Sequence, residues 1–449
     1  MNPLRSGRVL WAAVAVAAAL ILVATLLIVS RGEESPRPNI VLFITDDESL
    51  GSSEVMPNLR AWLVEDGRTF EPGLATTPMC CPSRASIFSG TYAHNNGVLT
   101  NRDALELDSG TTVQRYLSDA GYRTGIVGKY LNAWPRDVTP PHFDYSAVSH
   151  GTEYEGGTWT VNGEVEEVST YSTEFIGQQV EKFFESSDGR PWFLVISTTA
   201  PHSPAVPEPR YARAEVPPPQ DNPALADRDR SGKLPVEARY NFQSTRRFHA
   251  AQLRTMMSVD DLIGDVDDAL QERGQKEETL ALYISDNGLL RGEHALTGKG
   301  HPLRPAVEVP FYMSWPGTIE PGADERLAAN IDIGPTILDA AGLAADTDHP
   351  MDGRSLLDDW RRSEILLEYE MSGNFVSPSW ASLRSRDVQY IEYYDDDTGE
   401  VIFRELYDLI RDEWQVTNLL AGGGDPGFDV AALSRRLQSY RTCSGRDCP

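Results

Sequence analysis

The chain has 449 residues and a formal net charge of -27 at neutral pH, with 40% hydrophobic and 24% charged residues. This composition is ordinary for a globular protein and excludes a largely disordered chain, and the length is sufficient for a large core. The strong negative charge argues against nonspecific binding to nucleic acid or to anionic membrane surfaces, so we expect no nucleic-acid partner. An anionic substrate would need a locally basic pocket.

The first patterned segment is the apolar run from Val9 to Val29, which follows Arg5 and Arg8. A run of about 20 apolar residues spans a bilayer, whereas the core of a signal peptide has about 7 to 15. We therefore predict that residues 1–36 form a signal anchor, or alternatively a cleaved signal peptide, followed by a short tether. In both cases the rest of the chain is exported, and the protein is extracytoplasmic, either anchored to the membrane or secreted.

Two continuous apolar runs lead directly into side chains that carry oxygen ligands. They are Asp46, Asp47 and Glu48 after the run 38–45, and Asp286 and Asn287 after the run 280–285. Such runs are typical of strands buried in a parallel sheet, where ligands bind at the carboxyl ends of the strands. Because the donors are oxygens, Asp46, Asp47, Asp286 and Asn287 predict a Ca²⁺ site, with Mg²⁺ as the less suitable ion. For the first acidic group, a helix N-cap is the alternative interpretation.

Cationic side chains follow two further predicted strands. Lys129 comes after the strand 122–127, and His202 follows the strand 192–197 between two prolines that restrict the loop. A single lysine is usually a surface residue, and only its place at a strand end favours a functional role. The proline-rich stretch 205–240 is either the rim of a substrate site or a surface loop.

The alternation of strands and helices predicts an α/β fold with a mostly parallel central sheet flanked by helices over residues 37–360. Helices are expected at 56–63, 112–117, 173–184 and 248–272 and from 331 on, with a hairpin between 140 and 170 and another strand at 309–315. Residues 361–449 are expected to form a smaller C-terminal antiparallel sheet, with strands at 364–371, 388–394 and 401–406, and a helix at 429–440.

The four cysteines fall into two adjacent or nearby pairs. Cys443 and Cys448 close a small loop, and export permits a disulfide between them, with two free thiols as the alternative. Cys80 and Cys81 have no distant partner left, and a disulfide between adjacent residues is strained. A chemical role for one of them is therefore favoured.

The stretch around Cys80 carries a family motif. Cys80, Pro82, Ser83 and Arg84 match the pattern Cys-x-Pro-Ser-Arg, and the following Ala-Ser-x-x-x-Gly is matched through Gly90. With Asp46-Asp47, Gly128-Lys129, Asp286-Asn287 and Gly298-Lys299 in the same order, the chain resembles the formylglycine-dependent sulfatases of the alkaline-phosphatase-like superfamily. Within that family, the motifs are similar to those of the N-acetylglucosamine-6-sulfatase and extracellular endosulfatase branch.

The resemblance implies that residues 37–360 are a catalytic sulfatase domain and that a formylglycine-generating enzyme oxidises Cys80. One hydroxyl of the aldehyde hydrate would attack sulfur, and the other would allow the sulfate to be expelled. Arg84 would hold the hydrate, and residue 80 would join the four oxygen donors around Ca²⁺. Lys129, Lys299 and His202 would stabilise the developing charge, with His202 or Lys299 as the proton donor. Many sulfatases have a histidine where this chain has Leu131, so the residue that moves the proton of the hydrate is unassigned.

The function implied is that of a sulfuric ester hydrolase acting on sulfated carbohydrate or another sulfate ester. Two alternatives remain. One is a phosphate mono- or diesterase of the same superfamily, because the same metal and lysines would suit phosphoryl groups. The other is a catalytically silent, membrane-tethered carbohydrate-binding protein in which Cys80 is never modified.

Overall fold

The structure is a computed structural model that describes residues 37–449 except 237–241, 344–348 and 372–376. Within it, Pro38–Pro449 form one compact unit. The apolar run from Val9 to Val29 lies outside the described residues. Among the described residues, no helix is long and apolar enough to cross a membrane.

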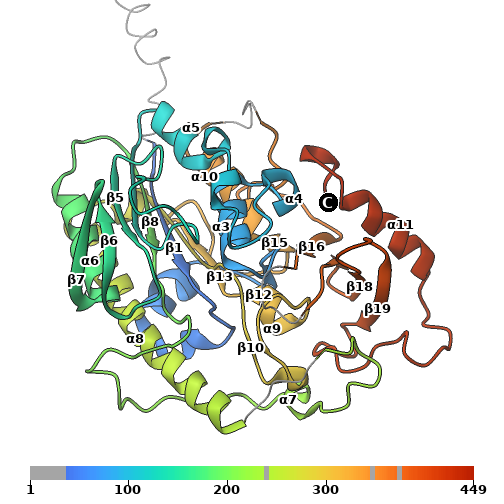
Figure 1. Ribbon diagram of the computed structural model, residues 1–449. Coiled ribbons are helices and arrows are strands. Elements are labelled where there is room, and N and C mark those ends of the chain that lie inside the picture. Colours follow the sequence, from blue (N-terminus) through green and yellow to red (C-terminus); the bar gives the residue numbers. More distant parts are fainter. Residues whose placement is uncertain (1–36, 237–241, 344–348, 372–376) are drawn as a thin grey trace, which may run out of the picture. The chain divides into compact units, whose positions relative to one another are not determined.

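A ten-stranded sheet in the order β14-β2-β13-β9-β1-β8-β4-β5-β6-β7 forms the centre of this unit (Figure 1). The strands are β1 (Asn39–Thr45), β2 (Arg68–Phe70), β4 (Arg123–Gly128), β5 (Tyr145–Ser149), β6 (Glu155–Val161), β7 (Glu164–Tyr171), β8 (Trp192–Ser197), β9 (Thr279–Ser285), β13 (Phe311–Ser314) and β14 (Gly322–Asp324). The five central strands from β9 to β5 are parallel to one another, whereas β13, β6 and β7 are antiparallel to their neighbours. The prediction of a mostly parallel sheet is therefore confirmed.

Helices cover both faces of the sheet because successive residues of a strand point to opposite sides. Ile40, Leu42 and Ile44 of β1 pack into one core with α3, α5 and α10, and Val41 and Phe43 pack into another with α2, α6 and α8. The helices are α2 (Pro57–Leu59), α3 (Cys80–Ser89), α5 (Val113–Asp119), α6 (Ser172–Glu185), α8 (Phe242–Glu272) and α10 (Ile333–Ala340). The helix predicted at 56–63 differs in its second half, where Arg60–Glu65 is a π-helix.

A four-stranded antiparallel sheet and a helix end the chain, as predicted. They are β16 (Ile365–Tyr369), β17 (Trp380–Arg384), β18 (Val388–Tyr394), β19 (Val401–Asp408) and α11 (Val430–Tyr440). Strand β17 was not predicted, because it contains no β-branched residue and is defined by its pairing with β16 and β18. The sheet shares a core with Met79, and Glu368 N donates to the carbonyl of Thr76, so it packs beside the segment that leads to Cys80. The domain boundary between 360 and 361 stays a prediction.

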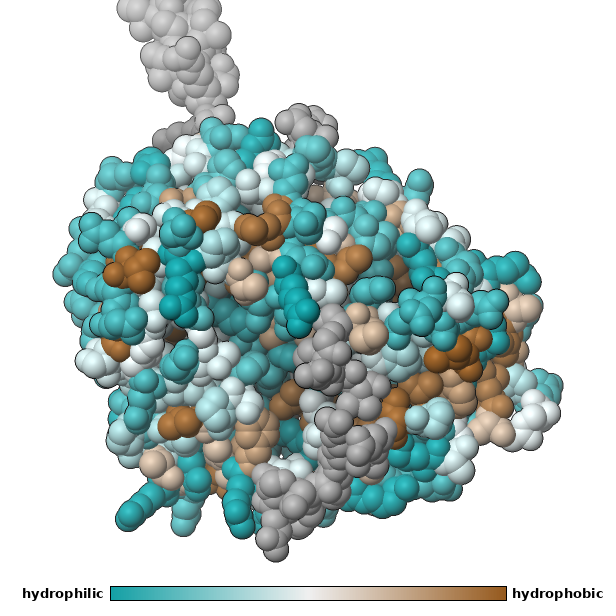
Figure 2. Space-filling view, in the orientation of Figure 1, coloured by the Kyte–Doolittle hydropathy of each residue, from teal (hydrophilic) through white to brown (hydrophobic). Residues whose placement is uncertain are grey.

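The visible face of the molecule is mostly hydrophilic. On the face in Figure 2, hydrophilic side chains predominate and apolar ones form small groups. The net charge of -27 gives anionic ligands no general attraction, so any anion site must depend on a local cluster of cations.

Candidate active site

The register of the central strands brings the predicted acidic residues together. Strands β1 and β9 pair up to Thr45 and Ser285, so Asp46 and Asp286 leave the sheet side by side. The backbone N–H of Asp286 donates to the carbonyl of Thr45 at 3.0 Å, and the backbone N–H of Asp47 donates to Asp286 Oδ1 at 3.2 Å. The N-cap interpretation is wrong, because the next helical turn begins after Gly51.

Cys80 is the first residue of α3 and lies against this acidic group. Its Sγ is 3.3 Å from Asp46 Oδ1 and 2.6 Å from Lys299 Nζ, and the residue is 1% exposed. Burial raises the pKa of the Cys80 thiol well above its usual value, and Asp46 adds to this, although Lys129 and Lys299 oppose it. The unmodified thiol is therefore neutral and a poor nucleophile.

Each buried cation of the site is paired with one carboxylate. Lys129 Nζ lies 2.5 Å from Asp46 Oδ2, and Lys299 Nζ lies 2.5 Å from Asp47 Oδ1. Burial alone would lower the pKa of both lysines, but the paired aspartates raise both values above the usual range. Burial would likewise raise the pKa of Asp46, but the surrounding cations, with Lys129 first, lower it. Both lysines and Asp46 are therefore charged at neutral pH.

Arg84 is fully buried and held by four hydrogen bonds, the longest of them from Nη1 to the carbonyl of Tyr130 at 3.4 Å. Its Nε donates to Asp286 Oδ2 at 2.7 Å, and its Nη1 donates to Ser197 Oγ at 2.6 Å and to the carbonyl of Lys129 at 2.9 Å. Its Nη2 is buried without a hydrogen-bond partner among the described residues. Nη2 is therefore a buried donor that is still available to a ligand.

His202 lies at the exposed side of the cluster. Its side chain is 24% exposed, and Nε2 is 3.6 Å from Asp47 Oδ2. The carbonyl of Ser203 accepts from Nδ1 at 2.6 Å, which directs Nε2 toward the site. Leu131, in contrast, is buried in the apolar core on the α3 side, so this position provides no group for proton transfer.

The oxygen donors fit a hard divalent cation. One ligand atom from each of Asp46, Asp47, Asp286 and Cys80 lies within 4.8 Å of the others, and all four residues are buried. Asn287 Nδ2 donates to Asp47 Oδ1 at 2.6 Å, whereas Asn287 Oδ1 is buried without a hydrogen-bond partner among the described residues. An unpartnered buried oxygen beside three carboxylates is the donor that a calcium ion would use.

Sequence reasoning missed two roles that polar residues play behind the site. Ser197 ends β8 and accepts a hydrogen bond from Arg84, and its sequence signal is a hydroxyl at the end of an apolar strand. Glu48 turns away from the cluster, where its Oε2 accepts from Thr45 Oγ1 at 2.5 Å and from the Tyr283 hydroxyl at 2.6 Å. Burial raises the pKa of this carboxyl group. Glu48 therefore supports the loop rather than joining the four oxygen donors.

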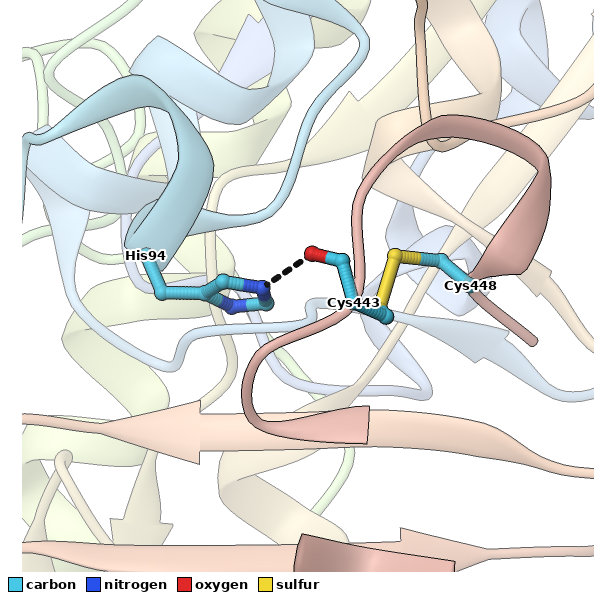
Figure 3. A group of neighbouring side chains, drawn as sticks. All are labelled: His94, Cys443 and Cys448. Carbon is cyan, nitrogen blue, oxygen red and sulfur yellow. Dashed lines mark hydrogen bonds between the residues drawn. A yellow bond between two sulfur atoms is a disulfide. The ribbon is translucent and has the colours of Figure 1, made fainter. Parts of the chain in front are cut away.

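A second group of potential metal ligands consists of His94, Cys443 and Cys448 (Figure 3). The two cysteines form the predicted disulfide, so their sulfurs are not available to a metal. His94 Nε2 lies 3.1 Å from the carbonyl of Cys443, and Nδ1 lies 2.9 Å from Glu368 Oε2. This group therefore connects the C-terminal loop to the rest of the unit.

The fold and the cluster define a member of the alkaline-phosphatase-like superfamily. The family model described as Sulfatase matches residues 38–343, and a model described as N-sulphoglucosamine sulphohydrolase, C-terminal, matches residues 292–440. The chain belongs to the sulfatase family of enzymes.

Relatives and solved structures agree with this assignment. Human N-acetylglucosamine-6-sulfatase is 30% identical over 481 residues, which cover 92% of this chain and 86% of the human protein. The putative extracellular sulfatase Sulf-1 homolog of Caenorhabditis elegans is 33% identical over 351 residues, or 71% of this chain, and the match spans only 48% of the worm protein. A solved structure of a protein in complex with its substrate D-glucosamine-2-N,6-O-disulfate aligns with a TM-score of 0.77 at 21% identity, over 90% of this chain and 97% of that chain. At this identity, the structural likeness shows the fold alone.

Proposed function

We propose that the chain hydrolyses the 6-O-sulfate ester of a glucosamine residue. The nucleophile is residue 80, after a formylglycine-generating enzyme has oxidised Cys80 to formylglycine. The observation that carries the proposal is the position of Cys80 Sγ, 3.3 Å from Asp46 Oδ1 and 2.6 Å from Lys299 Nζ. The sugar is inferred from the name of the human relative and from the substrate of the structural neighbour. The modification is favoured because the raised pKa of Cys80 keeps its thiol neutral, whereas an aldehyde hydrate supplies a hydroxyl nucleophile and a second hydroxyl for release of the sulfate.

We assign Asp46, Asp47, Asp286 and Asn287 as ligands of Ca²⁺, together with residue 80. When bound, the ion would act as a Lewis acid that polarises the sulfate group. Arg84, Lys129 and Lys299 balance the charges of the three aspartates, so these six groups together are neutral. A bound divalent ion would therefore give the site the positive charge that a sulfate ester and an oxygen nucleophile need.

The side chains of the site then have separate tasks. Arg84 Nη2, the unpartnered buried donor, holds the oxygen of the modified residue 80. Lys129 and Lys299 stabilise negative charge on the sulfate oxygens, since both are buried and charged. His202 protonates the leaving oxygen from Nε2 in the form of the ring that carries a proton on both nitrogens, because Nδ1 already donates to the carbonyl of Ser203 and the side chain, at 24% exposed, lies at the open side of the cluster.

We also propose an extracytoplasmic location. The worm relative is named as an extracellular sulfatase, and the Cys443–Cys448 disulfide is typical of an oxidising compartment. Attachment to a membrane through residues 9–29 stays a prediction.

Mass spectrometry of the peptide that contains Cys80, combined with a sulfate-release assay on glucosamine 6-O-sulfate, tests the proposal. We expect an aldehyde at residue 80 and turnover that Cys80→Ala abolishes. Cys81→Ala is the matched control, because Cys81 is equally buried but contacts the carbonyl of Asn132 rather than the carboxylate cluster. Active protein with an unmodified thiol would contradict the mechanism, and faster hydrolysis of a phosphate ester would favour the phosphatase alternative.

A further inference from the structure

A cavity of about 180 Å³ adjoins the loops that carry the acidic cluster. Its walls come from the loop after β1, the start of α8, β10 (Leu290–Arg291), α9 (Arg304–Val307) and the proline run 217–219. The volume is far above the roughly 15 Å³ that one ordered water needs, so the cavity can hold a larger group.

The cavity and the acidic cluster share two loops. Ser49 lines the cavity two residues after Asp47, and its hydroxyl donates to the carbonyl of Leu289, two residues after Asn287, at 3.0 Å. Because consecutive Cα atoms are about 3.8 Å apart, the Cα atoms of Ser49 and Asp47 are at most about 8 Å apart. On α8, Gln252 lies one turn after His249 and donates to the carbonyl of Pro201, next to His202, at 3.2 Å. The cavity therefore adjoins the loops that carry Asp47 and Asn287.

The lining of the cavity carries more cationic than anionic side chains, in contrast to the chain as a whole. Arg246, Arg291 and Arg304 line it, together with Glu54 and Glu293. Arg304 has its own partners in Glu308, at 2.8 Å, and Glu413, at 3.1 Å. Arg291, in contrast, is half-buried and forms no ion pair with any carboxylate in the described part of the chain; burial lowers the pKa of its guanidinium group, and Glu293 opposes this shift. A partly desolvated guanidinium without a carboxylate in direct contact favours an anionic ligand.

The contact between Arg291 and His249 leaves a second donor without an acceptor. Arg291 Nη1 lies 2.6 Å from His249 Nδ1, and because a guanidinium only donates, Nδ1 must accept. The proton of the imidazole is then on Nε2, which is buried and has no hydrogen-bond partner among the described residues. His249 is 7% exposed and lines the cavity. The carbonyl of Pro217 lies close enough to raise the pKa of His249, although burial and Arg291 lower it more strongly. This carbonyl is not placed to accept a hydrogen bond from Nε2.

We propose that this cavity is a subsite for a second sulfate group of the substrate, which accepts hydrogen bonds from Arg291 and from His249 Nε2. The proposal rests on the proposed function, because it takes the ligand to be a glycan whose 6-O-sulfate is held at residue 80. It predicts that the enzyme distinguishes doubly from singly sulfated glucosamine through residues outside the catalytic cluster.

The test compares the binding of D-glucosamine-2-N,6-O-disulfate and glucosamine 6-O-sulfate by calorimetry, in the full chain carrying Cys80→Ala so that neither ligand is consumed. We expect the disulfate to bind more tightly, and Arg291→Gln or His249→Phe to weaken its binding about tenfold or more, so that the ratio of the two affinities falls toward one. Arg291→Lys should retain part of the preference because it keeps the charge. Arg386→Gln is the matched control, because Arg386 is exposed and pairs with Glu325 away from the cavity.

An unchanged affinity ratio in both variants, with a melting temperature close to that of the parent, would overturn the proposal. A parallel titration with sodium sulfate separates the two sources of the anion. If Arg291→Gln removes binding of free sulfate but leaves the ratio unchanged, the cavity binds a free anion and the proposed subsite is wrong. Turnover of glucosamine 6-O-sulfate by the chain with intact Cys80 tests the proposed function separately, so the two proposals can fail independently.

Discussion

Replacing Arg84 by methionine should strongly destabilise the protein, because it leaves a carboxylate buried without its partner. The side chains of Arg84 and Asp286 are both 0% exposed, and Nε and Oδ2 are 2.7 Å apart. Burial and the neighbouring Asp46 already raise the pKa of Asp286, and Arg84 is the first of the cations that oppose this shift. Methionine keeps much of the apolar stem, so the main loss is the charge and its hydrogen bonds.

Breaking a buried ion pair from one side costs about 3–5 kcal/mol. With an unfolding entropy of about 2.1 cal/mol/K per residue, a unit of roughly 400 residues unfolds with about 0.9 kcal/mol/K. The expected fall in the melting temperature of Arg84→Met is therefore about 3–6 °C. Calorimetry in the presence of a chelator measures it, since a bound divalent ion would otherwise compensate the charge of Asp286.

The double variant Arg84→Met with Asp286→Asn distinguishes lost pairing from lost packing. If the unpaired charge causes the loss, the double variant should be more stable than Arg84→Met alone by about 1–3 kcal/mol. A double variant less stable than the single one, or a loss below about 1 kcal/mol in Arg84→Met, would refute the reasoning.

Three further predictions concern the metal, pH and the backbone. Calcium at about a hundredfold excess over its Kd should stabilise the protein by about 2.7 kcal/mol, and in Asn287→Ala the calcium-induced rise in melting temperature should fall by more than half, whereas an equal rise would exclude Asn287 as a ligand. Both nitrogens of His94 face acceptors, so the pKa of His94 is raised, although burial opposes this. The stability from His94 is then fully present below about pH 6.5 and is lost as the pH rises through the raised pKa, so urea titrations should show the deficit of His94→Gln shrinking above this pH. Gly128→Ala should cost about 3 kcal/mol or more in the same titrations, because Gly128 has a φ of +105° and its Cβ would lie 1.7 Å from the carbonyl oxygen of Ser197, whereas Gly121→Ala, at a φ of +88° in open space, should cost only about 1–2 kcal/mol.

The clustering of the acidic side chains could be predicted because burial leaves a local mark on the sequence. Strands β1 and β9 are buried on both faces, so they are continuous apolar runs, and Asp46 and Asp286 stand where those runs stop. The register that sets Thr45 opposite Ser285 is not written in either run. It follows from packing against helices on both sides, which a single sequence does not specify.

The cationic side of the site was predicted mainly from the family motif. Nothing near Lys299 marks it locally, since it lies between two glycines in a short irregular segment. It reaches Cys80 because β10 pairs with β11 (Thr297–Gly298) and because Gly300 N donates to the carbonyl of Pro78 at 3.0 Å. The first contact is a pairing of two-residue strands, and the second joins residues more than 200 positions apart in the chain, so local periodicity could not reveal either of them.

The charges of the described residues explain how an acidic protein can process an anionic ester. The surface charge acts on a substrate only weakly beyond about 8 Å at physiological ionic strength, because salt screens it. Inside the site, Lys129, Lys299 and Arg84 are buried, so water and salt screen their charges much less and they interact strongly with a ligand in direct contact. Each is held by an aspartate that a divalent ion would share, so binding of the ion frees positive charge for the sulfate. The net charge of the chain therefore affects solubility, whereas in the proposed mechanism the local pairing of three carboxylates with three cations governs the chemistry.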